Sequence, residues 1–211
     1  MHSRQSLLRG ALFVILASVP LMGRAQDGPG GLDRKEYDLG QILGAADDPD
    51  VLVDLIMAVL HPEEWDDVGG AGTISVAKAN GLVLVVRQTA AIHGEIASLL
   101  DVLSKMPRRK QHKPAAKGQP PKQIAVTLGK ADAEGLIVAV YDVADLVPTG
   151  NYAALVFPIR QLDPTTWNSV GGPGACAEFP PSKALVILQT DAGHRQVRDW
   201  LTLQRKKAAA N

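Results

Sequence analysis

The chain has 211 residues and carries 22 basic and 22 acidic residues, so its net charge is zero with neutral histidine. This length suits one medium domain or two small ones, and the neutral balance excludes a chain-wide basic or acidic field that would indicate a partner. A composition of 46% hydrophobic and 21% charged residues is typical of a globular protein. The single cysteine, Cys176, cannot form a disulfide within the chain, so packed cores must hold the fold.

Residues 1–25 have the three parts of a secretory signal peptide. Arg4 and Arg9 give a basic start, the apolar run ALFVILASVPLM follows, and the small-residue sequence GRA ends at Ala25. This pattern predicts cleavage after Ala25 and export to the periplasm or the cell surface. The rival interpretation is a membrane anchor, but the apolar run is shorter than the roughly 20 residues that span a bilayer. We therefore expect no transmembrane span in the mature chain.

The first predicted unit covers residues 26–106 and has the element order strand, helix, strand, strand, helix. A short strand lies around Tyr37, and Asp47 or Asp48 can cap a helix that has Pro49 at its first position. The spacing of Leu52, Leu55, Ile56 and Val59 predicts that this helix is amphipathic and runs to about Leu60.

A hairpin and a second helix complete this unit. The sequences TISVAK and GLVLVVRQT predict two strands that an Asn80–Gly81 turn joins. Thr89 is placed to cap the second helix, whose apolar face consists of Ile92, Ile96, Leu99, Leu100 and Leu103. Two helices that cover one face of a sheet predict a small α+β sandwich.

Residues 107–123 predict a flexible, solvated linker, because PRRKQHKPAAKGQPPKQ contains four prolines and no acidic residue. Fully extended it spans about 50 Å, so we expect the units on either side to act as separate beads. Export argues against nucleic acid, and leaves anionic lipid, an acidic polymer or an acidic protein face as contacts for this basic segment. Residues 26–106 offer such a face, with 14 acidic and 5 basic residues. The basic linker residues are Arg108, Arg109, Lys110, Lys113, Lys117 and Lys122.

Residues 124–211 form a second predicted unit that repeats the first, which indicates a tandem duplication of about 70 residues. PEEWDDVGGAG in the first unit corresponds to PTTWNSVGGPG in the second, and the other matches keep the same order. The repeated residues are Tyr37 and Tyr141; Pro62 and Pro164; Trp65 and Trp167; Gly69, Gly70 and Gly72 with Gly171, Gly172 and Gly174; Gln88 and Gln189; Thr89 and Thr190; and His93 and His194. Pro158 aligns with Ile56, so we expect the first helix of this unit to begin near Pro158 or to kink there.

The β-α-β-β-α order with apolar helices and a Val-rich hairpin resembles the ring-building modules of secretins. Those are small periplasmic domains that stack beneath outer-membrane secretion pores. The sequences YDVADLV, PTTWNSVGGPG and LVLVVRQTAAIHGEIASLLDVL are similar to those of exported, secretin-related repeat proteins. The resemblance covers both units, without a pore-forming region, and implies a non-enzymatic module for protein association.

The repeat also tests the candidate chemical sites, because a shared reaction needs shared reactive residues. PEEWDD beside His61 has the carboxylates of a hard-cation site, but PTTWNS has none, so we expect no metal. The repeated glycines follow a helix and precede a strand, which predicts turns with positive φ rather than a phosphate cradle. Trp65 and Trp167 are expected to pack the first helix of each unit onto its sheet, and the alternative is exposed anchors at an interface.

His93 and His194 are expected to bond a backbone carbonyl or the neighbouring Asp38 and Asp142, and the alternative is a pH-sensitive interface switch. Cys176 aligns with the strand residue Ile74, which predicts a small buried hydrophobe rather than a reactive thiol. No repeated acid–base or nucleophile set appears, so we expect neither catalysis nor a cofactor. The sequence favours protein association at the cell envelope, through a protein partner or self-association. The alternative is a module that binds an envelope polymer or surface ligand through the basic linker or exposed tryptophans.

Overall fold

The computed structural model describes residues 31–78, 81–106, 126–128 and 135–210. Two antiparallel sheets and four α-helices are formed by these residues, so the predicted α+β class is confirmed. The predicted signal peptide (1–25) and the predicted linker (107–123) both lie outside the described residues.

The first unit has the predicted element order. It contains β1 (Asp33–Asp38), α1 (Asp50–Val59), β2 (Thr73–Ala77), β3 (Val83–Gln88) and α2 (Ala90–Lys105), with the 3-10 turns η1 (Pro62–Glu64) and η2 (Asp66–Val68) between α1 and β2. The sheet order is β1-β3-β2, and alternate residues of β3 are buried beneath α1 and α2. As predicted, the Thr89 side chain caps α2 by accepting the Ile92 N–H.

The second unit repeats this order and adds one short strand. It contains β4 (Val126–Leu128), β5 (Leu136–Asp142), α3 (Ala153–Arg160), η3 (Asn168–Val170), β6 (Ala175–Phe179), η4 (Pro180–Ser182), β7 (Ala184–Thr190) and α4 (Asp191–Ala210). The sheet order is β4-β5-β7-β6. The sequence prediction did not include β4, whose three residues are too few to give a recognisable pattern.

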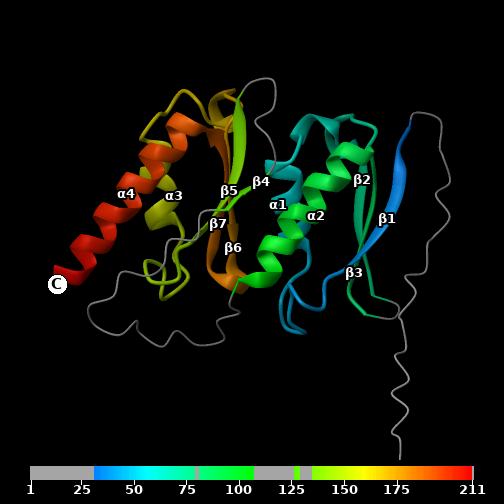
Figure 1. Ribbon diagram of the computed structural model, residues 1–211, viewed down its shortest axis with the longest axis horizontal. Coiled ribbons are helices and arrows are strands. Elements are labelled where there is room, and N and C mark those ends of the chain that lie inside the picture. Colours follow the sequence, from blue (N-terminus) through cyan, green and yellow to red (C-terminus); the bar gives the residue numbers. More distant parts are fainter. Residues whose placement is uncertain (1–30, 79–80, 107–125, 129–134, 211) are drawn as a thin grey trace, which may run out of the picture.

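The two units stack into four layers (Figure 1). From the N-terminal side these are the first sheet, helices α1 and α2, the second sheet, and helices α3 and α4. Helix α1 contacts β6 and β7 as well as its own β2, and α2 contacts β4. The helices of the first unit therefore cover a face of the second unit's sheet.

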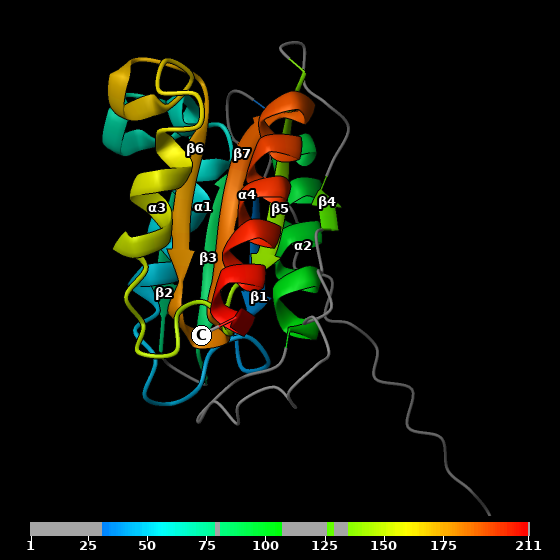
Figure 2. The same ribbon diagram turned by 90° about the vertical axis from the view of Figure 1, so that its left-hand side faces the viewer.

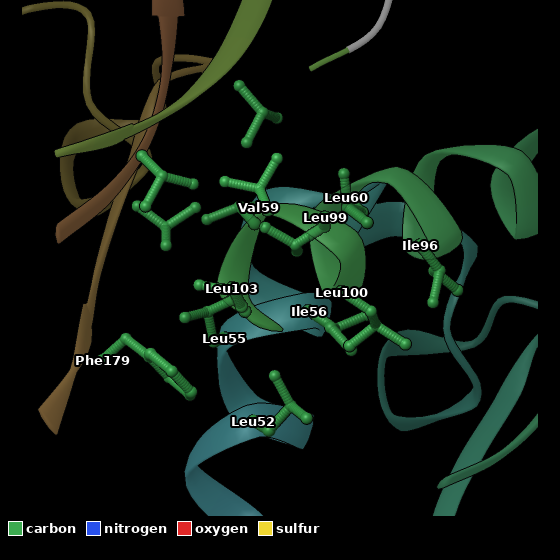
Figure 3. Close-up of a cluster of buried hydrophobic side chains, with 14 of the residues drawn as sticks. Leu52, Leu55, Ile56, Val59, Leu60, Ile96, Leu99, Leu100, Leu103 and Phe179 are labelled. Carbon is green, nitrogen blue, oxygen red and sulfur yellow. The ribbon is translucent and has the colours of Figure 1, made fainter. Parts of the chain in front are cut away.

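A single apolar core joins the two units, so the expectation of separate beads is wrong. Leu55, Val59 and Leu103 of the first unit belong to the same buried cluster as Val138 and Phe179 of the second. Figure 3 shows Phe179 on β6 beside Leu52 and Leu55 on α1. The physical reason is that α1 is apolar on both sides, which leaves a second face to be buried after its own sheet is covered.

The outer layer differs from the inner helical layer because its helices are one-sided. In α4 only His194, Val197 and Leu201 are buried, and in α3 only Leu155 and Ile159 are buried. The apolar ones among these residues pack against the second sheet, in a second cluster that also contains Trp167. The stack therefore ends at this layer with a largely polar surface.

Helix α3 does not begin near Pro158, as one form of the prediction had it, but at Ala153. The first helical hydrogen bonds, Leu52 N–H to Pro49 O and Leu155 N–H to Tyr152 O, place Pro158 opposite Leu55 rather than Ile56. The proline therefore avoids the face that packs on the sheet. Its missing N–H would have bonded the carbonyl of Ala154, which is an exposed residue where water can replace that bond.

Candidate functional site

In the first unit, the repeated histidine and tyrosine connect the start of α2 to β1. His93 is buried, its Nε2 lies 2.8 Å from the carbonyl oxygen of Asp33, and its Nδ1 lies 2.8 Å from the Tyr37 hydroxyl. A carbonyl can only accept, so Nε2 carries the proton and Nδ1 accepts from the tyrosine. Burial raises the pKa of Tyr37 to about 12, which keeps this hydroxyl a donor.

The second unit repeats this arrangement. His194 Nε2 lies 2.7 Å from the Ile137 carbonyl oxygen, and Nδ1 lies 2.7 Å from the Tyr141 hydroxyl. Burial lowers the pKa of His194, which favours the neutral ring that this bonding requires. Of the two predicted partners, the backbone carbonyl is thus the one present. Asp142 instead accepts the N–H of Ala144.

Trp65 and Trp167 lie inside the cores, with 0% and 2% of their surfaces exposed. The Trp65 indole N–H donates to the Leu60 carbonyl at 2.8 Å, which fixes the end of α1 onto the sheet. The predicted packing role is therefore present. The alternative that these residues are exposed anchors is wrong, because the corner that carries each of them folds the ring inward.

The repeated glycines serve two purposes rather than the one predicted. Gly69 and Gly171 have φ of 94° and 87°, as expected for turn glycines. Gly72 has a different reason, because a Cβ there would lie 2.1 Å from the Gln88 Nε2. Gly70 needs the same freedom from a side chain, since its Cβ would lie 2.1 Å from the backbone of Glu64. The close approaches recur at Gly172 and Gly174, which lie against Thr166 and Gln189.

The repeated glutamines connect this corner to the second helix of each unit. Gln88 Oε1 accepts the Thr89 N–H at 2.9 Å, and its Nε2 donates to the Glu64 carbonyl at 3.4 Å. Gln189 accepts the Thr190 N–H at 2.8 Å and donates to the Thr166 hydroxyl at 2.9 Å. Thr190 caps α4 through the Gly193 N–H, while Pro62 opens η1 and Pro164 lies in the turn before η3. All of these contacts support the scaffold.

Cys176 lies on β6 and packs against the second core cluster, but it is half-buried, so the predicted burial is present only in part. Burial raises the pKa of its thiol to about 12, so the thiolate needed for reaction is absent near neutral pH. The backbone of this residue is also engaged, because an Arg160 guanidinium nitrogen donates to its carbonyl at 3.4 Å. Sequence reasoning missed this contact, which depends on the direction in which an edge-strand carbonyl points.

The described surface has few features that suggest small-molecule chemistry. One shallow pocket of about 440 Å³ lies between the loop that follows β1 and the β2–β3 hairpin, with Asp47 and Lys78 among its lining residues. Within the described ranges, no three His, Cys, Asp or Glu side chains gather where a metal could bind. None of the helices described here has the length and apolarity to cross a membrane. The large apolar side chains that are exposed are Val68, Phe157, Val170 and Leu203.

Comparison with known proteins yields no relative. No protein-family model matches the chain, and no curated protein or solved structure is significantly similar to it.

Proposed function

We propose that this chain is an exported, non-catalytic module that binds a partner protein at the cell envelope, in the manner of the secretin modules that its sequence resembles. Residues 1–25 would direct export. The two stacked units would act as one rigid body that presents protein-binding surfaces.

The contacts of the repeated polar residues are the main support for this proposal. His93, Gln88 and Thr89, like their counterparts in the second unit, each hold one element of the scaffold to another. Side chains that are occupied in this way are poor candidates for binding or transforming a small substrate. The duplicated motif thus builds a scaffold, and the surface remains as the part that can act on other molecules.

The contact between the units supports protein association as the task of this surface. One β-α-β-β-α unit lies on another through apolar side chains, so the unit is suited to face-to-face packing. The face of the first sheet that points away from α1 and α2 is polar instead. On the first sheet, Arg34, Glu36 and Arg87 stand where the second sheet has the buried Val138, Val140 and Leu188. A polar terminal face of this kind ends a stack, which favours a different protein over a further copy as the partner.

The alternative of a polymer-binding module loses Trp65 and Trp167 as exposed contacts, because both are buried. Its other support, the basic linker with its anionic surface contact, lies outside the described residues. Protein association is therefore the stronger proposal.

Photo-crosslinking in the producing cell tests the proposal. A photoreactive residue is introduced at Thr73, Phe157 or Leu203, all exposed, or at the buried Leu84 as a control. We expect one discrete crosslinked protein from at least one exposed position and none from Leu84. Absence of any discrete product from all exposed positions, with the chain shown to be folded and exported, contradicts the proposal.

A further inference from the structure

Strand β2 forms an open edge of the first sheet. Among the described residues it pairs with β3 alone, and its five residues, TISVA, include no charged side chain. Edge strands in natural proteins are usually protected by charged residues, bulges or covering segments, because their free backbone groups pair readily with another strand. An unprotected edge of this kind is a place where an extended segment can add to a sheet.

The direction of the backbone groups can be followed along β2. Gly72 donates its N–H to Glu64 and accepts the Asp66 N–H, so both of its groups point to the segment outside the sheet. Backbone groups alternate in direction along a strand. Ile74 and Val76 therefore point outward as Gly72 does, while Ser75 points towards β3. These two residues offer two N–H donors and two carbonyl acceptors to an added strand.

The matching edge of the second sheet is closed by a side chain. Arg160 at the end of α3 donates to the carbonyl of Cys176, the residue that matches Ile74. When the helices are matched through their first hydrogen bonds, Arg160 corresponds to Met57 of α1. Figure 2 shows β2 and β6 on the same side of the molecule, each at an edge of its sheet. The arginine at this helix position covers the β6 edge, whereas the methionine at the matching position leaves the β2 edge open.

The open edge is bordered by apolar side chains. Met57, Ile74 and Val76 are only partly buried and pack against the core, so a part of each remains available at the surface. Methionine is flexible and polarizable, and it is frequent on surfaces that adapt to a bound peptide. An added strand could place alternate apolar side chains over this strip.

The surroundings of the edge are acidic. Glu63 and Glu64 in η1 and Asp66 and Asp67 in η2 are exposed and precede the start of β2, and Asp54 is exposed on α1. Lys78 follows the far end of the strand and Arg87 of β3 pairs with Thr73, so two cations stand against five acidic residues here. Complementary charge across an interface favours one class of partner and speeds its encounter. The complementary segment carries lysine or arginine.

We propose that the β2 edge binds an extended segment of a partner protein that alternates apolar and basic residues and adds to the first sheet as a fourth strand. Its backbone pairs with Ile74 and Val76, its apolar side chains cover Met57, and its basic side chains lie near the acidic residues of η1 and η2. This inference rests on the proposed function, since it specifies which surface of the association module holds the partner and what chemistry that partner has.

Amide NMR of the mature chain, residues 26–211, tests this surface. The probe is an acetylated, amidated octapeptide that alternates valine and lysine, and the control peptide alternates valine and glutamate. We expect the lysine peptide to shift the amides of Ile74 and Val76 most strongly and the glutamate peptide to bind at least about tenfold more weakly. Shifts that avoid β2, equal binding of both peptides, or no binding at millimolar peptide overturn the inference.

Two charge-matched variants complete the test. Met57→Arg places an arginine where the second unit has Arg160, and Ser98→Arg adds the same charge at an exposed position of α2. We expect Met57→Arg to weaken binding about tenfold or more and Ser98→Arg to leave it within about twofold. Equal affinity of the two variants overturns the inference. In the crosslinking experiment, a partner captured from Phe157 or Leu203 but not from Thr73 overturns this surface and leaves the proposed function standing. A partner captured from no exposed position overturns the function itself.

Discussion

Phe179→Ala tests the packing between the two units most sharply. Phe179 is 0% exposed and lies between the second sheet and α1 (Figure 3). Removing a buried phenylalanine ring costs about 3–5 kcal/mol of unfolding free energy, because the lost transfer energy adds to the cavity that remains. The same substitution at Phe157, which is 69% exposed, provides a matched control that should change stability by less than about 0.5 kcal/mol.

Urea unfolding of the mature chain, followed by circular dichroism, measures both variants. We expect Phe179→Ala to lower the midpoint strongly at an unchanged slope, and Phe157→Ala to overlay the parent. An unfolding free energy of Phe179→Ala within about 1 kcal/mol of the parent would refute the shared core, since removing a ring buried between two layers costs more than that. Equal losses for both variants would mean that the outer helices are covered in solution.

Three further outcomes follow from particular contacts. Gly72→Ala should lower the unfolding free energy by about 1–3 kcal/mol, because its Cβ would lie 2.1 Å from Gln88 Nε2, and thermal unfolding should show no such loss for Gly94→Ala, whose Cβ meets nothing within 4 Å. Burial lowers the pKa of His194 below 6.5, so the histidine of the unfolded chain is protonated first as the pH falls. The contribution of His194 to the unfolding free energy should therefore be fully present above pH 6.5 and decline below it. Urea titrations from pH 8 to pH 5 should show that decline, and a His194→Gln variant that keeps all of it would contradict this cause. Burial raises the pKa of the Cys176 thiol to about 12, so at pH 8 the folded chain should react with a thiol reagent much more slowly than the unfolded chain, and equal rates would contradict this burial.

The elements within each unit were predictable because each uses a local pattern. Thr89 and Thr190 cap the second helices, and the apolar spacing of Leu52, Ile56 and Val59 identified the face of α1 that lies on its sheet. These signals depend on residues close in the chain, so they do not change with the way in which the two units pack on each other.

The stacking of the units was missed although the sequence carries its signal. LIVAVYD and ALVILQT, which became β5 and β7, are nearly continuous apolar runs, and almost every residue in them is buried. Such runs are typical of strands covered on both faces, whereas VLVVRQ of β3 alternates in burial because one of its faces is open. The doubly covered positions include Val138 and Leu188, where the first unit has Arg34 and Arg87.

The candidate site was predictable only in part. Burial of His93 and Trp65 followed from their recurrence beside core positions, but the open edge at β2 did not. Recognising it required the direction of the Ile74 backbone and the contact that Arg160 makes in the other unit. Both depend on three-dimensional pairing, which no local pattern encodes.

Cleavage between the units tests the stacked body most directly. A specific protease site is placed within residues 107–123 of the mature chain, the folded protein is cut, and its mass is measured by size exclusion with light scattering at low and high salt. The shared apolar core predicts that the two fragments elute together with the mass of the uncut chain at both salt concentrations, because apolar contacts are not screened by ions. Fragments that separate as two independent species would contradict the stacked arrangement on which the proposed binding surfaces depend.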